Sequence, residues 1–262
     1  MAIEKMDLTQ RLKGKVAVIT GGASGIGLAT ARRMAAEGAI IVIGDMNPES
    51  GEAIAAELGG LFVKVNVADE AEVNNLFDTT FATYGSVDIA FNNAGISPPD
   101  DDSIETTELP AWQKVQDVNL KSVYLCCRAA LRYMTKQQSG SIINTASFVA
   151  VMGSATSQIS YTASKGGVLA MSRELGVQFA RQGIRVNALC PGPADTPLLQ
   201  ELFAKDPERA QRRLVHVPIG RFAKPEELAA AVAFLASDDA GFITGSTFLV
   251  DGGISGAYVT PL

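Results

Sequence analysis

Short apolar segments alternate with longer amphipathic ones along most of this 262-residue chain. The first apolar segment, residues 15–20, has the sequence KVAVIT, a nearly continuous run typical of a strand buried on both faces of a parallel sheet. Comparable runs recur along the chain. We predict strands at residues 15–20, 40–44, 61–65, 87–91, 141–146, 184–189 and 247–250.

The segments between these strands have helical composition. Asn47 is a good N-cap for the second of them, because Pro48 then takes the first helical position. We predict helices at residues 28–37, 48–58, 69–84, 112–136, 157–181 and 225–237.

Strands that alternate with helices of this length imply right-handed βαβ units and a mostly parallel sheet. Seven strands with helices on both faces predict an α/β fold, a single doubly wound Rossmann domain. We assign residues 1–14 to a polar N-terminal extension and residues 15–262 to this domain. Residues 190–220 form a long irregular stretch, which we expect to be a substrate loop or lid.

Composition and charge exclude several classes of protein. Hydrophobic residues make up 47% of the chain, and its net charge of −6 comes without a Lys/Arg cluster, so no nucleic-acid or membrane partner is expected. The N-terminus lacks the apolar core of a signal peptide, and no apolar run approaches the roughly 18 residues of a membrane span. We expect a soluble, cytoplasmic protein.

Cysteine and histidine usage leaves little room for metal chemistry. Cys126 and Cys127 lie in a helical pattern and Cys190 follows an apolar strand, so all three are expected in the core. The single histidine, His216, supports neither a metal site nor a Ser-His-Asp triad.

A glycine-rich segment joins the first strand to the first helix. Gly21, Gly25 and Gly27 follow a GxxxGxG spacing, which permits a tight turn and a close approach of the backbone to a pyrophosphate at the helix N-terminus. The alternative is a glycine-rich turn that binds nothing. The strand–turn–helix context favours nucleotide binding.

An acidic residue closes the second strand. Asp45 stands 18 residues after Gly27, where a carboxylate accepts hydrogen bonds from the adenosine ribose hydroxyls and repels a 2′-phosphate. No Arg or Lys lies in the glycine segment or directly after Asp45, so we predict NAD rather than NADP. The alternative is an Asp that serves only the turn before Asn47.

Tyr161 and Lys165 stand four residues apart in one predicted helix, so both side chains leave the same face. A neighbouring ammonium favours the phenolate and lowers the tyrosine pKa from about 10, which suits a general acid or base. The alternative is a buried Tyr beside a surface Lys.

Four further candidates follow strands or interrupt a helix. Asn93 to Gly95 come after the fourth strand, Ser147 ends the fifth, and Pro191 to Thr196 follow the sixth, at the edge where such sheets bind ligands. Asn119 lies within a predicted helix, where its amide can hold a water that links Lys165 to solvent. Each alone is equally compatible with an ordinary turn, loop or solvated side chain.

Taken in order and spacing, these motifs resemble the short-chain dehydrogenase/reductase family from about residue 15 to 253. The resemblance implies a catalytic tetrad of Asn119, Ser147, Tyr161 and Lys165, with Tyr161 as the acid/base. It implies a second role for Lys165 at the nicotinamide ribose, and it implies that Ser147 polarises the carbonyl.

The resemblance also implies the cofactor contacts. Asn66 stands where many family members carry Asp to bind adenine, and Ser24 stands where NADP-preferring members often carry a basic residue, which again favours NAD. The expected cofactor-binding residues are Gly21, Ser24, Gly25, Ile26, Gly27, Asp45, Asn66, Val67, Asn93, Ala94, Gly95, Tyr161, Lys165, Pro191, Gly192, Ala194 and Thr196.

The expected activity is hydride transfer between NAD and a secondary alcohol or ketone, in a homotetramer of the kind common in the family. Apolar walls are expected from Val149, Val151, Met152 and Leu199, with a lid containing Phe203, Leu214 and His216, whereas residues 100–102 are expected to form a solvated loop. The alternatives are an NADPH-dependent 3-oxoacyl-[acyl-carrier-protein] reductase, a non-catalytic dinucleotide sensor and, more weakly, a methyltransferase-type nucleotide fold.

Overall fold

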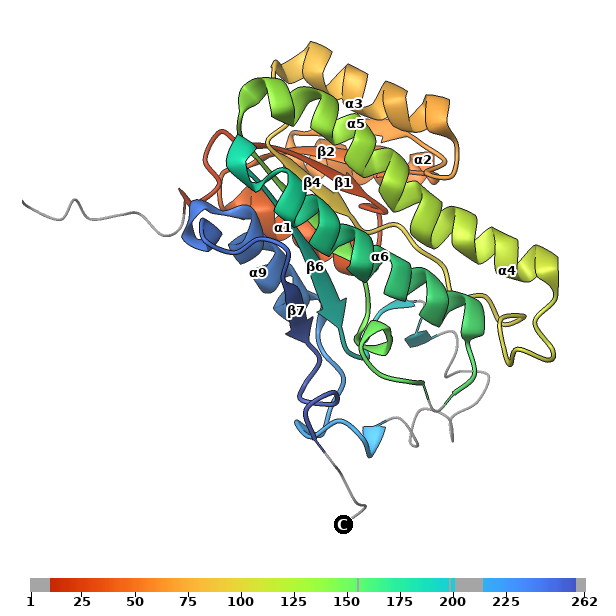
Figure 1. Cartoon of the computed structure of the whole chain (residues 1–262). Coiled ribbons are helices and arrows are strands. Elements are labelled where there is room, and N and C mark those ends of the chain that lie inside the picture. The colour runs from red at the N-terminus through yellow and green to blue at the C-terminus, as the bar shows by residue number, and fades with distance from the viewer. Residues whose placement is uncertain (1–9, 155, 198, 201–213, 258–262) are drawn as a thin grey trace, which may run out of the picture.

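Parallel strands form one seven-stranded sheet in the computed structural model of the chain, which describes residues 10–154, 156–197, 199–200 and 214–257 (Figure 1). The order β3-β2-β1-β4-β5-β6-β7 confirms the predicted doubly wound fold. The strands are β1 (Val16–Thr20), β2 (Ile40–Asp45), β3 (Leu61–Lys64), β4 (Ile89–Asn92), β5 (Gly140–Thr145), β6 (Ile184–Pro191) and β7 (Thr247–Val250).

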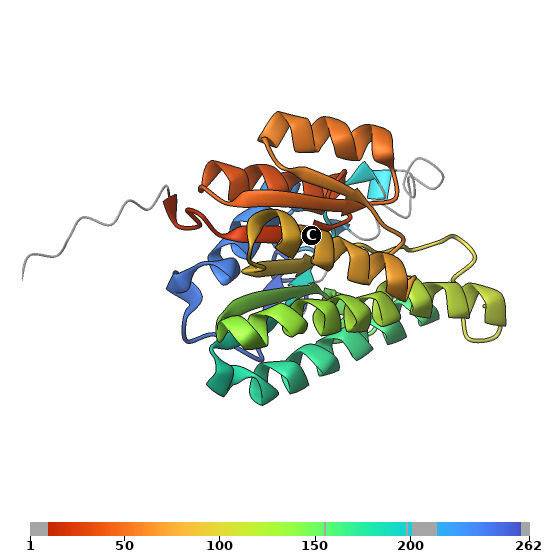
Figure 2. The same ribbon diagram turned by 90° about the horizontal axis from the view of Figure 1, so that it is seen from above.

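Helices cover both faces of this sheet, as the view from above shows (Figure 2). Along β1, Val16 and Val18 pack on the face covered by α3, α5 and α6, whereas Ala17 and Ile19 pack on the face covered by α1, α2 and α9. This alternation explains why the strand sequence is apolar throughout. The helices are α1 (Gly25–Ala36), α2 (Pro48–Leu58), α3 (Glu70–Tyr84), α4 (Leu109–Gln116), α5 (Ser122–Gln137), α6 (Ile159–Gln178) and α9 (Pro225–Ala236).

The strand order reverses between β1 and β4. The chain leaves β1 toward β2 and β3 and then crosses back to place β4 on the other side of β1. The loops after β1 and β4 therefore diverge at the carboxyl edge, which is where open parallel sheets bind ligands.

One predicted helix is interrupted. The segment predicted as a single helix over residues 112–136 is α4 and α5, joined by a π-helical turn at Asp117–Lys121. The interruption contains Asn119, which is completely buried. A π-turn inserts one residue into the helical ladder and re-aims its side chains, and composition alone does not reveal it.

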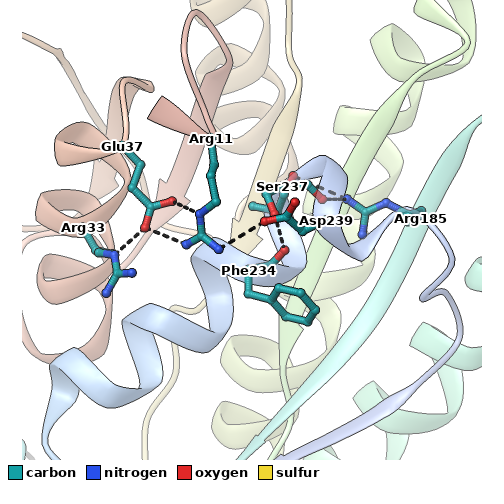
Figure 3. Close-up of polar contacts among 8 residues, drawn as sticks. Arg11, Arg33, Glu37, Arg185, Phe234, Ser237 and Asp239 are labelled. Atoms are coloured by element: carbon teal, nitrogen blue, oxygen red, sulfur yellow. Dashed lines mark hydrogen bonds and ion pairs between the residues drawn. The ribbon is translucent and has the colours of Figure 1, made fainter. Parts of the chain in front are cut away.

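Residues 10–14, which we assigned to the N-terminal extension, pack against the domain. Leu12 is fully buried, and Arg11 bonds to Glu37 at the end of α1 and to Asp239 beyond α9 (Figure 3). Arg185 on β6 donates to the carbonyl of Ser237, which directly follows α9. These contacts tie the end of α1, the end of α9 and the sheet together on one side of the molecule.

The cysteines are in the core, as predicted. Cys126, Cys127 and Cys190 are buried and free. Within the described ranges there is no group of three His, Cys, Asp or Glu side chains that could hold a metal ion, and no helix has the length and apolar character needed to cross a bilayer.

Candidate active site

The glycine segment turns tightly enough that a larger side chain does not fit. Gly21 has φ +64°, and a Cβ on Gly27 would stand 2.0 Å from the carbonyl oxygen of Gly21. Only glycine allows α1 to start this close to the end of β1. The turn is therefore built as the sequence predicts.

Hydrogen bonds in both directions hold the loop after β4 against the glycine segment. The hydroxyl of Thr20 accepts from the backbone N–H groups of Asn93 and Ala94 at 3.0 and 3.2 Å. In return the amide of Asn93 donates to the carbonyls of Thr20 and Gly21. The structure thus brings together Gly21, Asn93 and Ala94, three of the expected cofactor residues, at the point where the strand order reverses.

The N-terminus of α1 fits a pyrophosphate. Ser24 occupies the N-cap position but makes no side-chain cap bond, and the first turn contains no acidic residue. By contrast, α2 and α3 are capped by the side chains of Asn47 and Asp69. Amides left without a side-chain cap, together with the positive end of the helix dipole, suit an anionic group.

Asp45 performs a structural task in the turn after β2. One of its carboxylate oxygens accepts from the N–H of Ala23 in the glycine segment at 3.1 Å, and the other accepts from the N–H of Asn47 at 3.1 Å. The alternative role in the turn before Asn47 is therefore realised. The same contacts hold the carboxylate beside the glycine segment, where the adenosine ribose is expected.

The side chain of Asn66, expected to bind adenine, already has a hydrogen-bond partner within the protein. The side-chain oxygen of Asn66 accepts from the N–H of Ala68 at 3.1 Å, and its backbone N–H donates to Glu72 at 2.7 Å. The adjacent Val67 is buried. The oxygen we expected to face adenine thus already has a backbone partner.

Tyr161 and Lys165 lie in the first two turns of α6. The Nζ of Lys165 lies 5.6 Å from the centroid of the Tyr161 ring and donates to the carbonyl of Thr145 at 2.7 Å. Lys165 is only 3% exposed, and burial lowers its pKa to about 8. Because Lys165 is buried, the alternative of a surface lysine is wrong. With a pKa of about 8, its amine remains mostly protonated at neutral pH.

Asn119 has different partners from those expected. Its side-chain oxygen accepts from the N–H of Ile96 and its amide donates to the carbonyl of Ile96, each at 2.8 Å. A Cβ on Gly95 would stand 3.3 Å from the Asn119 oxygen and 3.5 Å from the Lys165 Nζ. The amide therefore fixes the loop after β4 beside Lys165, and its part in a proton path stays a prediction.

Ser147 lies two residues after the end of β5, where it caps the short 3-10 helix Phe148–Ala150, and it lines the same cavity as Tyr161. It is 4% exposed, and its hydroxyl accepts a long bond of 3.4 Å from the N–H of Val149. Burial raises the pKa of the neighbouring Cys190 thiol to about 11, and the backbone of Ser147 offsets only part of this rise in pKa. The thiol therefore stays neutral and takes no part in acid–base work.

A cavity of about 660 Å³ lies at the catalytic end of the predicted site, and its described lining does not include Gly21, Asp45 or Asn66. Tyr161 and Ser147 line it, and so does Thr145, whose buried hydroxyl has no hydrogen-bond partner. The remaining expected cofactor residues in its wall are Ile26, Pro191, Gly192, Ala194 and Thr196.

The cavity walls only partly match the prediction. Met152 and Leu199 line it, but Val149 packs in the core and Val151 is 43% exposed outside the lining. Of the predicted lid, His216 and the neighbouring Val215 line the cavity, Leu214 does not, and Phe203 falls outside the described residues. Ile254 and Ala257 also line it and were not predicted.

Asp101 corrects the expected solvated loop at residues 100–102. It is 5% exposed and accepts from the backbone N–H groups of Ser160 and Tyr161 at the start of α6. No sequence signal could have found this role, because the partners lie 59 and 60 residues away.

The chain is similar to dehydrogenases and reductases over nearly its whole length. The family model described as Enoyl-(Acyl carrier protein) reductase matches residues 21–255. Cis-4-hydroxycyclohexanecarboxylate dehydrogenase of Sinomonas cyclohexanicum is 44% identical, with 91% of this chain and 96% of that protein covered. The 3-oxoacyl-[acyl-carrier-protein] reductase of Thermotoga maritima is 40% identical, with 93% and 99% covered.

Among solved structures, levodione reductase superposes with a TM-score of 0.89 at 36% identity. The match covers 94% of this chain and all of that one.

Proposed function

This chain belongs to the short-chain dehydrogenase/reductase family, and on that premise we propose that it transfers a hydride between NAD and an apolar secondary alcohol or ketone, with Tyr161 as general acid/base. One observation carries the proposal. Tyr161 and Ser147 line the same cavity as Pro191, Gly192 and Thr196, so the proton-handling groups and these expected cofactor-binding residues face one space.

The residues divide the proton chemistry among them. In alcohol oxidation, the Tyr161 phenolate takes the proton of the substrate hydroxyl, and in reduction the phenol returns it to the carbonyl oxygen. The Lys165 ammonium, whose Nζ lies 5.6 Å from the centroid of the Tyr161 ring, stabilises the phenolate, and the Ser147 hydroxyl donates to the substrate oxygen. NAD, when bound, supplies the hydride acceptor.

The preference for NAD rests on Asp45. Its carboxylate is held beside the glycine segment by the N–H of Ala23, at the end of β2. A fixed negative charge there repels a 2′-phosphate, and Met46 follows instead of a basic residue.

The cavity supports an apolar substrate. Its described wall contains Ile26, Phe148, Met152, Leu199 and Ile254, and it contains no Asp, Glu, Lys or Arg within the described ranges. Hydroxyl and amide groups are also present, so one polar group besides the reacting oxygen is accommodated.

A substrate panel with NAD and NADP side by side tests the function. We expect oxidation of cyclohexanol, 2-octanol or cis-4-hydroxycyclohexanecarboxylate with NAD, and loss of at least about 1,000-fold in kcat for Tyr161→Phe with NADH binding retained. Full turnover by Tyr161→Phe would remove Tyr161 from the mechanism. Reduction of a 3-oxoacyl thioester with NADPH alone would favour the reductase alternative, and turnover of any panel member would exclude a non-catalytic sensor.

We also propose a homotetramer. Large apolar side chains are exposed at Val177 on α6, Phe242 after α9 and Leu249 on β7, and a second copy can cover them. Light scattering at micromolar concentration tests this assembly. A monomer would contradict it, and the cytoplasmic location likewise stays a prediction.

A further inference from the structure

The start of α6 is held by a segment far away in the sequence. A helix leaves its first backbone N–H groups without intrahelical partners, and its N-cap residue, Gln158, makes no side-chain cap bond. Instead, Ile159 donates to the carbonyl of Asp102 at 3.1 Å. Ser160 and Tyr161 donate to the two carboxylate oxygens of Asp101, each at 2.8 Å.

We call these bonds from the start of α6 to Asp101 and Asp102 the clamp, and Asp101 accepts two of them. It is only 5% exposed, and a buried carboxylate is costly unless it is well bonded. Here both oxygens accept backbone bonds, and the positive end of the α6 dipole adds a favourable interaction. From the opposite side the amide of Gln116 donates to the carbonyl of Ser160 at 3.0 Å, so the first turn is gripped by both α4 and the loop after β4.

The clamp acts at the residue that carries the chemistry. Tyr161 is the third residue of α6, so its own backbone N–H is one of the bonds that Asp101 accepts. The segment before Asp101 is also constrained, because the N–H of Asp101 donates to the carbonyl of Pro98. Ser97, in the same segment, lines the substrate cavity. One carboxylate thus ties a cavity wall to the helix turn that carries Tyr161.

We propose that Asp101 is a positioning residue, which fixes the first turn of α6 so that the Tyr161 hydroxyl meets the reacting oxygen. The inference rests on the proposed role of Tyr161 as the acid/base. Asp101 makes no contact with substrate in this scheme, and it acts only through the backbone of Tyr161. A displacement of about 1 Å at a reacting group lowers rates by about 100-fold, so such a clamp has catalytic consequences.

Two variants test it in the whole protein, using the panel alcohol with the highest turnover and NAD. Asp101→Asn keeps one acceptor oxygen but loses the charge, and Asp101→Ala loses both acceptors. We expect kcat to fall about 10-fold for Asp101→Asn and about 100-fold for Asp101→Ala. The NADH dissociation constant, measured by fluorescence, stays within about twofold, because the expected contacts of the glycine segment and Asp45 are unchanged.

Asp88→Asn is the matched control. Asp88 also accepts from a backbone N–H at 2.8 Å, that of Val16, but at the opposite edge of the sheet. We expect it to lower the melting temperature and leave kcat unchanged. If Asp101→Asn and Asp101→Ala lower kcat no more than Asp88→Asn does, Asp101 serves folding alone and the proposal is wrong.

A readout without substrate separates this proposal from the proposed function. Hydrogen exchange of the amides at residues 159–161 should be at least about 10-fold faster in Asp101→Ala, and unchanged exchange would overturn the clamp. If Tyr161→Phe keeps full turnover, the assigned chemistry fails whatever Asp101 does. If Tyr161→Phe is inactive and Asp101→Ala is fully active, only the positioning role fails.

Discussion

The ammonium of Lys165 lies 5.6 Å from the centre of the Tyr161 ring, one helical turn further along α6. The positive charge that favours the Tyr161 phenolate is itself almost completely buried, because Lys165 is 3% exposed. Burial lowers the pKa of Lys165 from 10.5 to about 8. The Lys165 ammonium that the proposed chemistry needs therefore lowers the stability of the fold, because its charge is buried.

Lys165→Met should therefore abolish turnover and stabilise the protein. A lowering of the pKa from 10.5 to about 8 corresponds to about 3 kcal/mol of charge burial at pH 7. The lost bond to the Thr145 carbonyl offsets part of this, so the free energy of unfolding should rise by about 1–2 kcal/mol in the cofactor-free protein. Urea unfolding at pH 7 measures it.

The same pair of proteins has a defined pH dependence. Between pH 8 and 10.5 the unfolded chain binds a proton at Lys165 that the folded chain does not, so the stability of the wild type rises with pH in that window. The advantage of Lys165→Met should then shrink and reverse sign before about pH 10.5, where only its lost bond to the Thr145 carbonyl remains. A constant difference from pH 7 to 10.5 would show that the ammonium is not held at a cost.

Asp45→Asn should relax the cofactor preference. The substitution removes the charge that repels a 2′-phosphate while keeping an oxygen for the N–H of Ala23. We expect kcat/KM with NADP to rise about 10-fold, with a smaller fall for NAD. Steady-state kinetics with both cofactors measure the ratio, and a wild type that already prefers NADP would contradict the assignment.

Gly27→Ala should prevent dinucleotide binding. Its Cβ would stand 2.0 Å from the Gly21 carbonyl oxygen, so the turn must open. We expect NADH affinity to fall at least about 100-fold, because the approach to the helix N-terminus depends on this turn. Gly166→Ala is the control, since its Cβ meets no atom within 4 Å, and it should stabilise α6 by about 0.5–1 kcal/mol. Equal NADH affinity in the two variants would show that the glycine segment is not part of the dinucleotide-binding site.

The ion pairs of Glu37 make stability sensitive to acid (Figure 3). Burial alone would raise the pKa of Glu37, but its bonds to Arg11 and Arg33 hold that pKa below the ordinary value of 4.5. The stabilisation is therefore present above pH 4.5 and is lost as the pH falls through the lower folded value. Glu37→Gln should cost about 1–2 kcal/mol at pH 7 and almost nothing below that value. Urea unfolding of both proteins from pH 7 to 3 measures the difference, and a difference independent of pH would contradict it.

Local sequence determined most of the architecture. The alternation of apolar strands with helices gave the order of elements, and several boundaries match closely, such as α2 at Pro48–Leu58 and β7 at Thr247–Val250. It also determined the glycine turn and the shared face of Tyr161 and Lys165. These features follow from backbone geometry and helical periodicity over a few residues, so a single segment contains all the information they need.

Tertiary structure decided which groups serve the site. Asp101 grips the turn of Tyr161, the amide of Asn119 binds Ile96, and Lys165 donates to the Thr145 carbonyl. Each pair joins segments 20 or more residues apart, and such contacts leave no periodic signal in either segment. Burial of Lys165 and Asp101 also follows from packing between elements, so the lowered pKa of Lys165 and the clamp on α6 were settled only when the chain folded.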